Sequence, residues 1–234
     1  MRLLELFPRG FEEVEWPDRV ELVVYVDAAG EAEARREFGT LSSEAVEPGW
    51  EERWREFHRP VRAAGLWIGP PWEEPPAATP AVLVDPGQAF GTGAHPTTRA
   101  CIELLAGLER GSLLDVGCGS GVFGVAAVRL GFGPVLALDS DPVAVAVARE
   151  TARLNGVAID VRRADALRDD LPASDVLVAN IELRVVEALL ARRPPAKLAV
   201  TSGYLAGEEP RCGGWRIVSR LDVDGWAAHV LASP

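Results

Sequence analysis

The stretch LLDVGCGSG, residues 113–121, decides the fold, and LALD at residues 136–139 extends it. A short apolar run ends at Asp115, and glycines then occupy the alternate positions 117, 119 and 121. A second apolar run ends at Asp139. Glycine tolerates the backbone angles of a sharp strand-to-helix turn and lets the backbone approach a ligand closely. The pattern indicates strand, glycine turn, helix, strand and acid, the first part of a nucleotide-binding βαβ unit.

Two cofactor interpretations fit these glycines. The D-x-G-x-G-x-G spacing resembles the S-adenosylmethionine loop of class I methyltransferases. Gly119, Gly121 and Gly124 also satisfy G-x-G-x-x-G, the dinucleotide signature, although its first glycine would then follow the strand late. A glycine-rich turn without any ligand is the plain structural alternative. Asp139 is expected at the tip of the neighbouring strand. Its carboxylate can accept hydrogen bonds from both hydroxyls of a ribose, which favours a nucleotide-like cofactor.

Length and composition bound the class of protein. The chain has 234 residues, 48% hydrophobic and 25% charged, enough for one medium domain plus a small one. No apolar run approaches the ~18 residues of a membrane span, and the N-terminal residues do not resemble a signal peptide. The three cysteines, Cys101, Cys118 and Cys212, have no metal-ligand spacing. We therefore expect a cytoplasmic protein with reduced thiols, no membrane contact and no bound metal.

The formal net charge is −11 at pH 7. Such acidity disfavours direct nucleic-acid binding, because phosphates need a basic surface. It favours encounter with a basic partner, although many soluble proteins are acidic for solubility alone. We expect a monomer whose partner is a basic protein substrate.

Residues 1–46 are expected to form a small α+β domain for substrate recognition. Its expected elements are a helix at residues 31–38 and strands at residues 2–7, 20–26 and 41–46. Residues 47–80 are expected to link it to the rest of the chain. This linker begins with a helix whose apolar face carries Trp50, Trp54 and Phe57. It ends in the proline-rich connector GPPWEEPPAATP, residues 69–80.

Residues 81–234 are expected to form an α/β domain with a Rossmann-like, doubly wound, mostly parallel seven-stranded sheet, because strand and helix patterns alternate. The expected helices span residues 97–108, 121–130, 142–154 and 182–191. The expected strands span residues 112–116, 134–139, 160–163, 176–180, 197–202, 215–221 and 226–232, the last two as an antiparallel hairpin. Asp141 is the expected N-cap of the third helix, and Asn155 with Gly156 ends it.

Polar residues follow the ends of several of these strands. Ligands bind at the carboxyl ends of such strands, near the point where the strand order reverses. Asp115, Asp139 and Asn180 are each expected there. Asp165 is placed to meet the amino group of an adenine, or to serve as a turn or cap residue.

The segment VDPGQAFGTGAHPTT, residues 84–98, is expected to fold over this end of the sheet as a mobile loop. Thr97 or Thr98 can give a hydroxyl to the cofactor, and one of them can cap the following helix. His95 is a candidate acid or base, with a structural role as its alternative.

The runs DPGQAFGTGAHPTT, LLDVGCGSG, LALDSDPVAVAVARETARLNGV and VLVANI resemble the PrmA family, the bacterial ribosomal protein L11 methyltransferases. The resemblance covers about residues 48–207. It implies a class I fold, an N-terminal recognition domain, and S-adenosyl-L-methionine-dependent methylation of lysine and N-terminal amines of that ribosomal protein. It carries over Thr98, Gly117, Asp139 and Asn180 as cofactor contacts, and residues 90–93 as the mobile loop at the cofactor entrance.

The candidate site is therefore defined as follows. Asn180 and His95 are the candidate catalytic residues. The candidate cofactor-binding residues are Phe90, Gly91, Thr98, Asp115, Gly117, Gly119, Gly121, Asp139, Asp165 and Asn180. Methyl transfer to a neutral amine needs orientation, for which the Asn180 oxygen is suited, and requires neither a strong general base nor a metal.

The sequence departs from the family pattern at three places. The N-terminal domain has room only for a trimmed ferredoxin-like fold without its first helix. Glu182 stands where the family often has a small or apolar residue, and TSGYL at residues 201–205 replaces the usual SGIL. Four alternatives stay open: lysine methylation of another protein, as in the enzymes that modify the electron-transfer flavoprotein β subunit; a non-catalytic ribosome-associated or scaffold protein that keeps the cofactor pocket; a nicotinamide oxidoreductase; and methylation of a small molecule or a nucleic acid.

Overall fold

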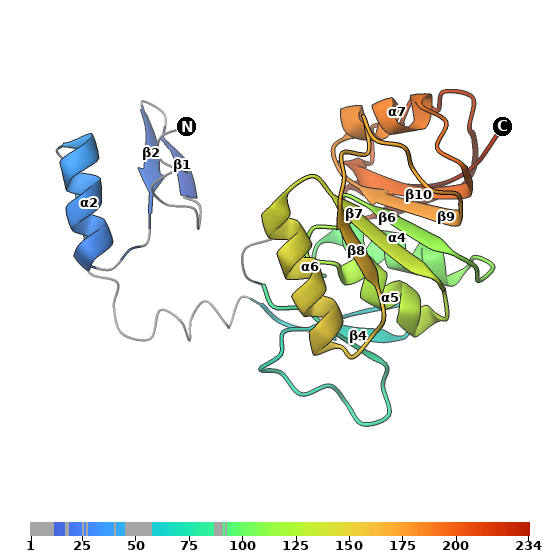
Figure 1. The fold of residues 1–234 in the computed structure, drawn as a ribbon, viewed down its shortest axis with the longest axis horizontal. Helices are drawn as coiled ribbons and strands as arrows, with labels where there is room; N and C mark the ends of the chain where they lie inside the picture. Colours follow the sequence, from blue (N-terminus) through green and yellow to red (C-terminus); the bar gives the residue numbers. More distant parts are fainter. Residues whose placement is uncertain are drawn as a thin grey trace. The chain divides into compact units, whose positions relative to one another are not determined.

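The computed structural model describes residues 12–16, 19–24, 26, 28–39, 41–44, 58–86, 91 and 93–234. The chain divides into two compact units, Met1–Arg53 and Trp54–Pro234. The first unit contains an antiparallel pair, β1 (Glu12–Trp16) and β2 (Arg19–Val23), followed by helix α2 (Ala28–Phe38) (Figure 1). Strand β2 and helix α2 correspond to the elements expected at residues 20–26 and 31–38, whereas the strand expected at residues 2–7 lies outside the described residues.

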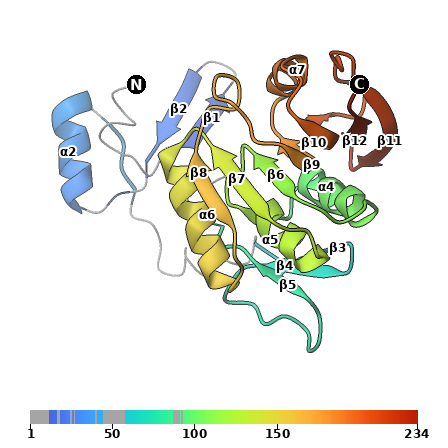
Figure 2. The same ribbon diagram turned by 45° about the vertical axis from the view of Figure 1, so that its right-hand side comes forward.

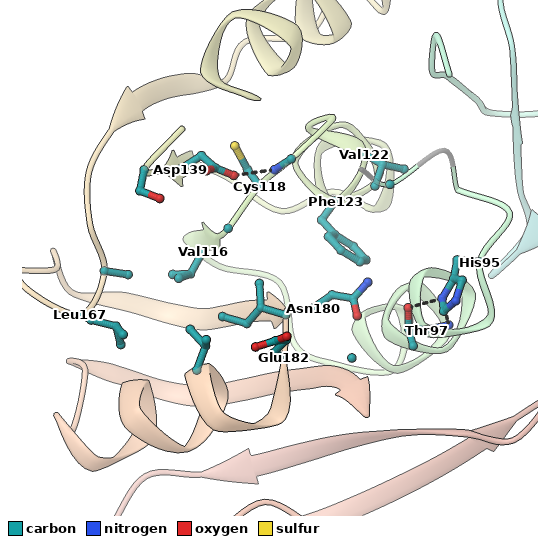
Figure 3. Close-up of a pocket in the computed structure, with 18 of the residues that line it drawn as sticks. His95, Thr97, Val116, Cys118, Val122, Phe123, Asp139, Leu167, Asn180 and Glu182 are labelled. Carbon is teal, nitrogen blue, oxygen red and sulfur yellow. Dashed lines mark hydrogen bonds between the residues drawn. The ribbon is translucent and has the colours of Figure 1, made fainter. Parts of the chain in front are cut away.

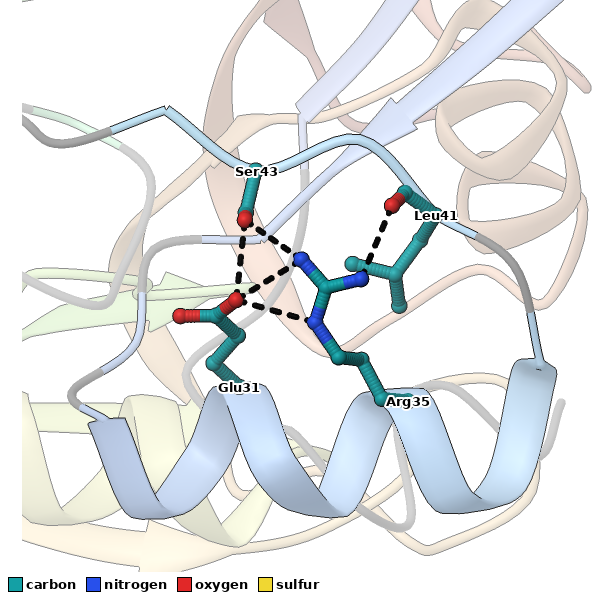
Figure 4. A network of polar contacts seen from close by, with 4 residues as sticks. All are labelled: Glu31, Arg35, Leu41 and Ser43. Carbon is teal, nitrogen blue, oxygen red and sulfur yellow. Dashed lines mark hydrogen bonds and ion pairs between the residues drawn. The ribbon is translucent and has the colours of Figure 1, made fainter.

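The strand expected at residues 41–46 is wrong where it is described, because residues 41–44 are not in a strand. Side-chain contacts with α2 hold this segment instead (Figure 4). Glu31 Oε1 accepts from Arg35 Nη2 at 2.8 Å and from Ser43 Oγ at 2.8 Å. Arg35 Nη1 donates to the Leu41 carbonyl at 3.2 Å. A polar network on the helix surface therefore takes the place of a ladder of backbone hydrogen bonds.

In the described part of the second unit, seven strands form one sheet, in the order β11-β12-β10-β9-β6-β7-β8 (Figure 2). Their bounds are β6 (Leu113–Val116), β7 (Val135–Asp139), β8 (Asp160–Arg163), β9 (Ser174–Asn180), β10 (Ala196–Leu205), β11 (Arg216–Val223) and β12 (Trp226–Ala232). Strand β12 runs antiparallel to both of its neighbours, and the other neighbouring pairs are parallel. The expected doubly wound, mostly parallel fold is confirmed. The strand order reverses between β6 and β9, which is where ligands bind in such sheets.

Helices cover both faces of this sheet. Their bounds are α4 (Pro96–Ala106), α5 (Val122–Leu130), α6 (Pro142–Leu154) and α7 (Leu183–Ala191). Residues of α4 and α5 share one apolar cluster with residues of β6, β9 and β12, whereas α7 belongs to a second cluster on the opposite face. All four residues of β6 are buried, as expected for a central parallel strand with both faces covered.

A second, three-stranded sheet was not expected from the sequence. It consists of β3 (Val61–Ala63), β4 (Leu66–Gly69) and β5 (Ala81–Leu83), in that order. The connector at residues 69–80, expected to mark a domain boundary, instead joins β4 to β5 inside the second unit. Ile68 and Val82 are buried in the same apolar cluster as α4 and α5. Trp50, Trp54 and Phe57 lie outside the described residues.

Two helix starts show how local chemistry sets the boundaries. Asp141 caps α6 as expected, because its side chain accepts from the Val143 amide at 2.8 Å. The cap expected from Thr97 or Thr98 is wrong, because α4 begins one residue earlier, with Pro96 in its first turn. His95 is the N-cap, and its Nδ1 accepts from the Thr97 amide at 3.4 Å. The helix is therefore capped by an imidazole nitrogen and not by the expected threonine hydroxyl.

Within the described ranges, no helix is long and apolar enough to cross a membrane. The same ranges contain no group of three or more His, Cys, Asp or Glu side chains arranged to hold a metal ion.

Candidate active site

A cleft of about 740 Å³ opens at the carboxyl ends of β6, β7 and β9 (Figure 3). A volume of this order suits a ligand of cofactor size. The lining residues come from the glycine turn, the tips of β7 and β9, the loop after β8 and the start of α4. They include Gly91, His95, Thr97, Gly117, Gly119, Phe123, Asp139, Asp165, Leu167, Asn180, Glu182, Gly203 and Trp226.

The glycine turn forms the floor of the cleft. Gly117 and Gly119 line it with φ angles of +71° and +51°. A Cβ on Gly117 would lie 2.7 Å from Ile181 Cγ2, so a side chain there would also disturb the tip of β9. Gly121 does not line the cleft: it begins α5 at φ +80°, and a Cβ there would come within 3.0 Å of Ala148. Gly121 therefore permits helix packing rather than ligand contact.

Asp139 lies at the tip of β7 and faces the glycine turn (Figure 3). Its Oδ2 accepts from the Gly119 amide and its Oδ1 from the Asp141 amide, both at 3.0 Å. These bonds fix the carboxylate against the turn. A carboxylate has about four acceptor positions, so two remain for ligand hydroxyls.

Asp165 also lines the cleft, so the structure brings it together with Asp139. Its Oδ1 accepts from the Leu167 amide at 2.9 Å, and Arg168 Nε lies 3.5 Å from its Oδ2. The side chain thus stabilises a turn and at the same time faces the cleft. The two alternatives for this residue are compatible.

Asp115 and Thr98 are not among the lining residues; both are buried. Neither carboxyl oxygen of Asp115 has a hydrogen-bond partner among the described residues, and the same is true of the Thr98 hydroxyl. Burial, and next the charge of Asp139, raise the pKa of Asp115 to about 8. Thr97 lines the cleft in place of Thr98.

His95 lies at the opposite end of the cleft from Asp139 (Figure 3). Its Nδ1 is 2.7 Å from the Thr97 hydroxyl, and its ring meets the Trp226 ring edge-on at a centroid distance of 4.8 Å. Burial, and next the charge of Arg99, lower the pKa of His95 below its usual range. The imidazole is therefore neutral near pH 7 and is held as a cap and a wall of the cleft.

Asn180 ends β9 and is half-buried, with its amide directed into the middle of the cleft (Figure 3). The neighbouring strand β10 approaches this tip through Gly203, at φ +104°. A Cβ on Gly203 would lie 2.1 Å from the Ile181 carbonyl oxygen. The Ile181 amide donates to the Ser202 carbonyl at 3.1 Å. In the sequence, Gly203 stands out only as part of a departure from the family pattern, and no local signal indicates its position beside Asn180.

The loop before α4 is only partly described, and Phe90 lies outside the described residues. Gly91 lines the cleft, and its carbonyl accepts from the Ser120 hydroxyl at 2.6 Å. Gly93 is buried, and a Cβ on it would lie 2.3 Å from Ile68 Cγ2. The end of this loop is therefore attached to the glycine turn and to the small sheet.

The charged side chains among the described lining residues of the cleft are all carboxylates. Asp139, Asp165 and Glu182 line it, and no lysine or arginine is among its described lining residues. Such a field attracts cations, such as a sulfonium or an ammonium group, and repels the pyrophosphate of a dinucleotide. The electrostatics therefore favour the methyltransferase interpretation over the oxidoreductase one.

Comparison with known proteins agrees with this choice. The family profile described as "Ribosomal protein L11 methyltransferase (PrmA)" matches residues 16–211. The chain belongs to this family. It is 36% identical over 250 residues to a "Ribosomal protein L11 methyltransferase" of Symbiobacterium thermophilum, covering 93% of this chain and 82% of that protein. The protein of the same name from Pelobacter propionicus is 42% identical over 175 residues, 68% of this chain and 57% of its own length.

Solved structures give the same result for the fold. The chain resembles the crystal structure of a ribosomal protein L11 methylase from Lactobacillus delbrueckii subsp. bulgaricus with a TM-score of 0.68 and 25% identity. The match covers 75% of this chain and 99% of that one. The expected family and class I fold are confirmed, and the chain is a methyltransferase.

Proposed function

We propose that this chain transfers methyl groups from S-adenosyl-L-methionine to lysine and/or N-terminal amino groups of ribosomal protein L11. Two findings support ribosomal protein L11 as the substrate. The chain belongs to the family, and the match to the relative from Symbiobacterium thermophilum covers 93% of this chain. The observation that carries the site is the convergence of Asp139, the glycine turn and Asn180 on one anionic cleft of about 740 Å³.

The residues present fit this cofactor. The bare backbone of Gly117 and Gly119 leaves room for its amino-acid part, and the Asp139 carboxylate suits its ribose hydroxyls. Asp165 and Leu167, which follow β8 and line the cleft, would contact the adenine. When bound, S-adenosyl-L-methionine supplies a methyl group on an electrophilic sulfonium.

The task of the protein is to present a neutral amine in line with that methyl group. Orientation of this kind can supply up to roughly 7–11 kcal/mol of a barrier. A free lysine titrates at about 10.4, and partial burial beside the uncharged Asn180 amide disfavours its charged form. The Asn180 side-chain oxygen accepts a hydrogen bond from the amine and directs its lone pair. His95 is proposed to hold Thr97 and the cleft wall rather than to move a proton.

We propose further that the N-terminal unit recognises the substrate and that the enzyme acts as a cytoplasmic monomer without direct contact to nucleic acid. The net charge of −11 supports a basic protein partner.

The test uses the full chain, isotopically labelled S-adenosyl-L-methionine and unmethylated recombinant ribosomal protein L11. Wild type is expected to label that protein at amines identified by mass spectrometry. Asn180→Ala should lower kcat by about 100-fold, with a smaller loss of cofactor affinity in calorimetry. Asn180→Asp keeps an acceptor oxygen but places a carboxylate beside the amine and raises the amine's pKa, so its kcat should also fall near pH 7 and recover as the pH rises.

The outcomes separate the alternatives. Labelling of a different protein in a cell lysate, with ribosomal protein L11 untouched, would replace the proposed substrate. Cofactor binding without methyl transfer to any cell protein would support a non-catalytic role. Parental turnover in Asn180→Ala would remove Asn180 from the mechanism.

A further inference from the structure

Glu182 lines the cleft, and its carboxylate forms no hydrogen bond or ion pair with the described part of the protein. It precedes α7 as its N-cap residue, but its side chain makes no capping hydrogen bond. Among the residues that the structure describes, its carboxylate has neither a hydrogen-bond nor an ion-pair partner. Glu187, one turn further along α7, differs: its Oε1 accepts from the Arg211 amide at 2.9 Å. An exposed acid at a helix start that does not cap the helix is free to bind a ligand.

The other two carboxylates of the cleft are already engaged. Asp139 accepts from two backbone amides, those of Gly119 and Asp141. Asp165 accepts from the Leu167 amide and lies beside Arg168. Both also follow other strands than Asn180 does: Asp139 ends β7, and Asp165 comes two residues after β8. Glu182 is thus the lining carboxylate whose oxygens have no hydrogen-bond or ion-pair partner in the described part of the protein.

The position of Glu182 relative to Asn180 indicates which of the two an entering amine meets first. Two residues of extended chain span at most about 7 Å, so Glu182 and Asn180 stand at neighbouring points of one wall (Figure 3). Glu182 is exposed, whereas Asn180 is half-buried. A group that enters from solvent would meet the carboxylate at the mouth before the amide in the interior.

We infer that Glu182 binds the protonated acceptor amine at the mouth of the cleft. The amine then moves inward from Glu182 to Asn180, where it accepts the methyl group. The inference rests on the proposed function and adds a residue that selects acceptors by charge. An ammonium group offers three donors, and a carboxylate binds it by charge-assisted hydrogen bonds.

Glu182 and Asn180 act in succession because they favour different protonation states of the acceptor amine. A nearby carboxylate stabilises the charged amine and so raises its pKa, which suits capture but opposes methyl transfer. The uncharged Asn180 amide does not hold the amine in its charged form. As the amine moves inward from Glu182, it releases its proton to solvent at the exposed mouth. Glu182 is thus a positioning residue, and the reacting form of the amine is the one at Asn180.

The test compares four full-length proteins in steady-state kinetics with unmethylated ribosomal protein L11 and S-adenosyl-L-methionine, at low and high salt. They are wild type, Glu182→Gln, Glu182→Asp and Glu109→Gln. Glu109 is an exposed glutamate that does not line the cleft, so its variant loses the same charge away from the site. It controls for the effect of net charge on encounter.

Glu182→Gln is expected to raise the KM for the acceptor about two- to fivefold at low salt, the effect of one exposed ion pair. Its kcat and its KM for the cofactor should change less than about twofold. Glu182→Asp, which keeps the charge, should stay close to wild type, as should Glu109→Gln. In about 1 M salt, where the screening length falls to about 3 Å, the wild-type and Glu182→Gln values should converge.

Equal acceptor KM values for wild type and Glu182→Gln at low salt would overturn the inference and leave the proposed function standing. An equal rise in Glu109→Gln would also overturn it, because net charge would then explain the effect. Failure of the wild type to methylate ribosomal protein L11 would overturn the proposed function, and the inference with it.

Discussion

Substitution of Gly203 by alanine tests how closely β10 must approach the acceptor end of the cleft. The added Cβ would lie 2.1 Å from the Ile181 carbonyl oxygen and 2.7 Å from its carbonyl carbon. Real Cβ contacts are essentially never found under 3.0 Å, so the backbone must shift by about 1 Å at Gly203, at Ile181 or at both. Asn180 immediately precedes Ile181, so a shift at Ile181 displaces Asn180 as well.

A displacement of that size can cost about 100-fold in rate when it misaligns reacting groups. We therefore expect Gly203→Ala to lower kcat by about 100-fold. Cofactor affinity should change little, because Asp139 and the glycine turn lie on other strands. The positive φ of +104° at Gly203 adds backbone strain, so stability should fall by about 2–4 kcal/mol.

The assay combines methyl-transfer kinetics, calorimetric titration with the cofactor, and thermal unfolding. Gly207→Ala is the matched control, because a Cβ there meets nothing within 4 Å. It should behave as wild type in all three measurements. Wild-type kcat in a folded Gly203→Ala protein would refute the reasoning, as would an equal loss of activity in Gly207→Ala.

Three further results are expected. Asp139→Ala should weaken cofactor binding about 10- to 100-fold in calorimetry, since bonds to a charged acceptor are lost, and unchanged affinity would contradict its role. Asp115, with its pKa near 8, keeps a proton in the folded state that the unfolded chain has lost above about pH 4. Wild-type stability should therefore fall relative to Asp115→Asn as pH rises from 5 to 8 in urea unfolding, whereas a constant difference would argue against the raised pKa. A thiol reagent should modify Cys212 first, because Cys101 and Cys118 are buried whereas Cys212 is half-buried; peptide mapping that found Cys101 labelled first would contradict this.

Elements with strong local signals were predictable from sequence. The helix at residues 142–154 and the strands at residues 160–163 and 226–232 have the predicted bounds. Caps define the helix and an apolar run defines the last strand. The short strands β3, β4 and β5 were not predicted. Each has only three or four residues, too few for periodicity to be recognised, and a proline-rich connector separates β4 from β5.

Some lining residues have a sequence signal and others have none. Asp139, Asp165 and Asn180 line the cleft, and the signal for each is its position at or just after a strand end. Asp115 was expected to line the cleft, but the alternation of side chains along β6 turns it toward the interior, where it is buried.

Adjacent residues can also differ in ways that the sequence does not reveal. Thr97 rather than Thr98 lines the cleft, because the phase of α4 follows from its cap at His95. Gly203 lies at a register shift between Ser202 and Tyr204, and such a shift depends on the pairing of β10 with β12. Neither feature has a local sequence signal.

The most direct test of the account is a crystal structure of the protein with S-adenosylhomocysteine, the demethylated form of the cofactor. The account predicts its ribose hydroxyls on Asp139, its adenine beside Asp165 and Leu167, and its sulfur facing Asn180. Binding elsewhere, or in this cleft with the sulfur turned away from Asn180, would contradict it.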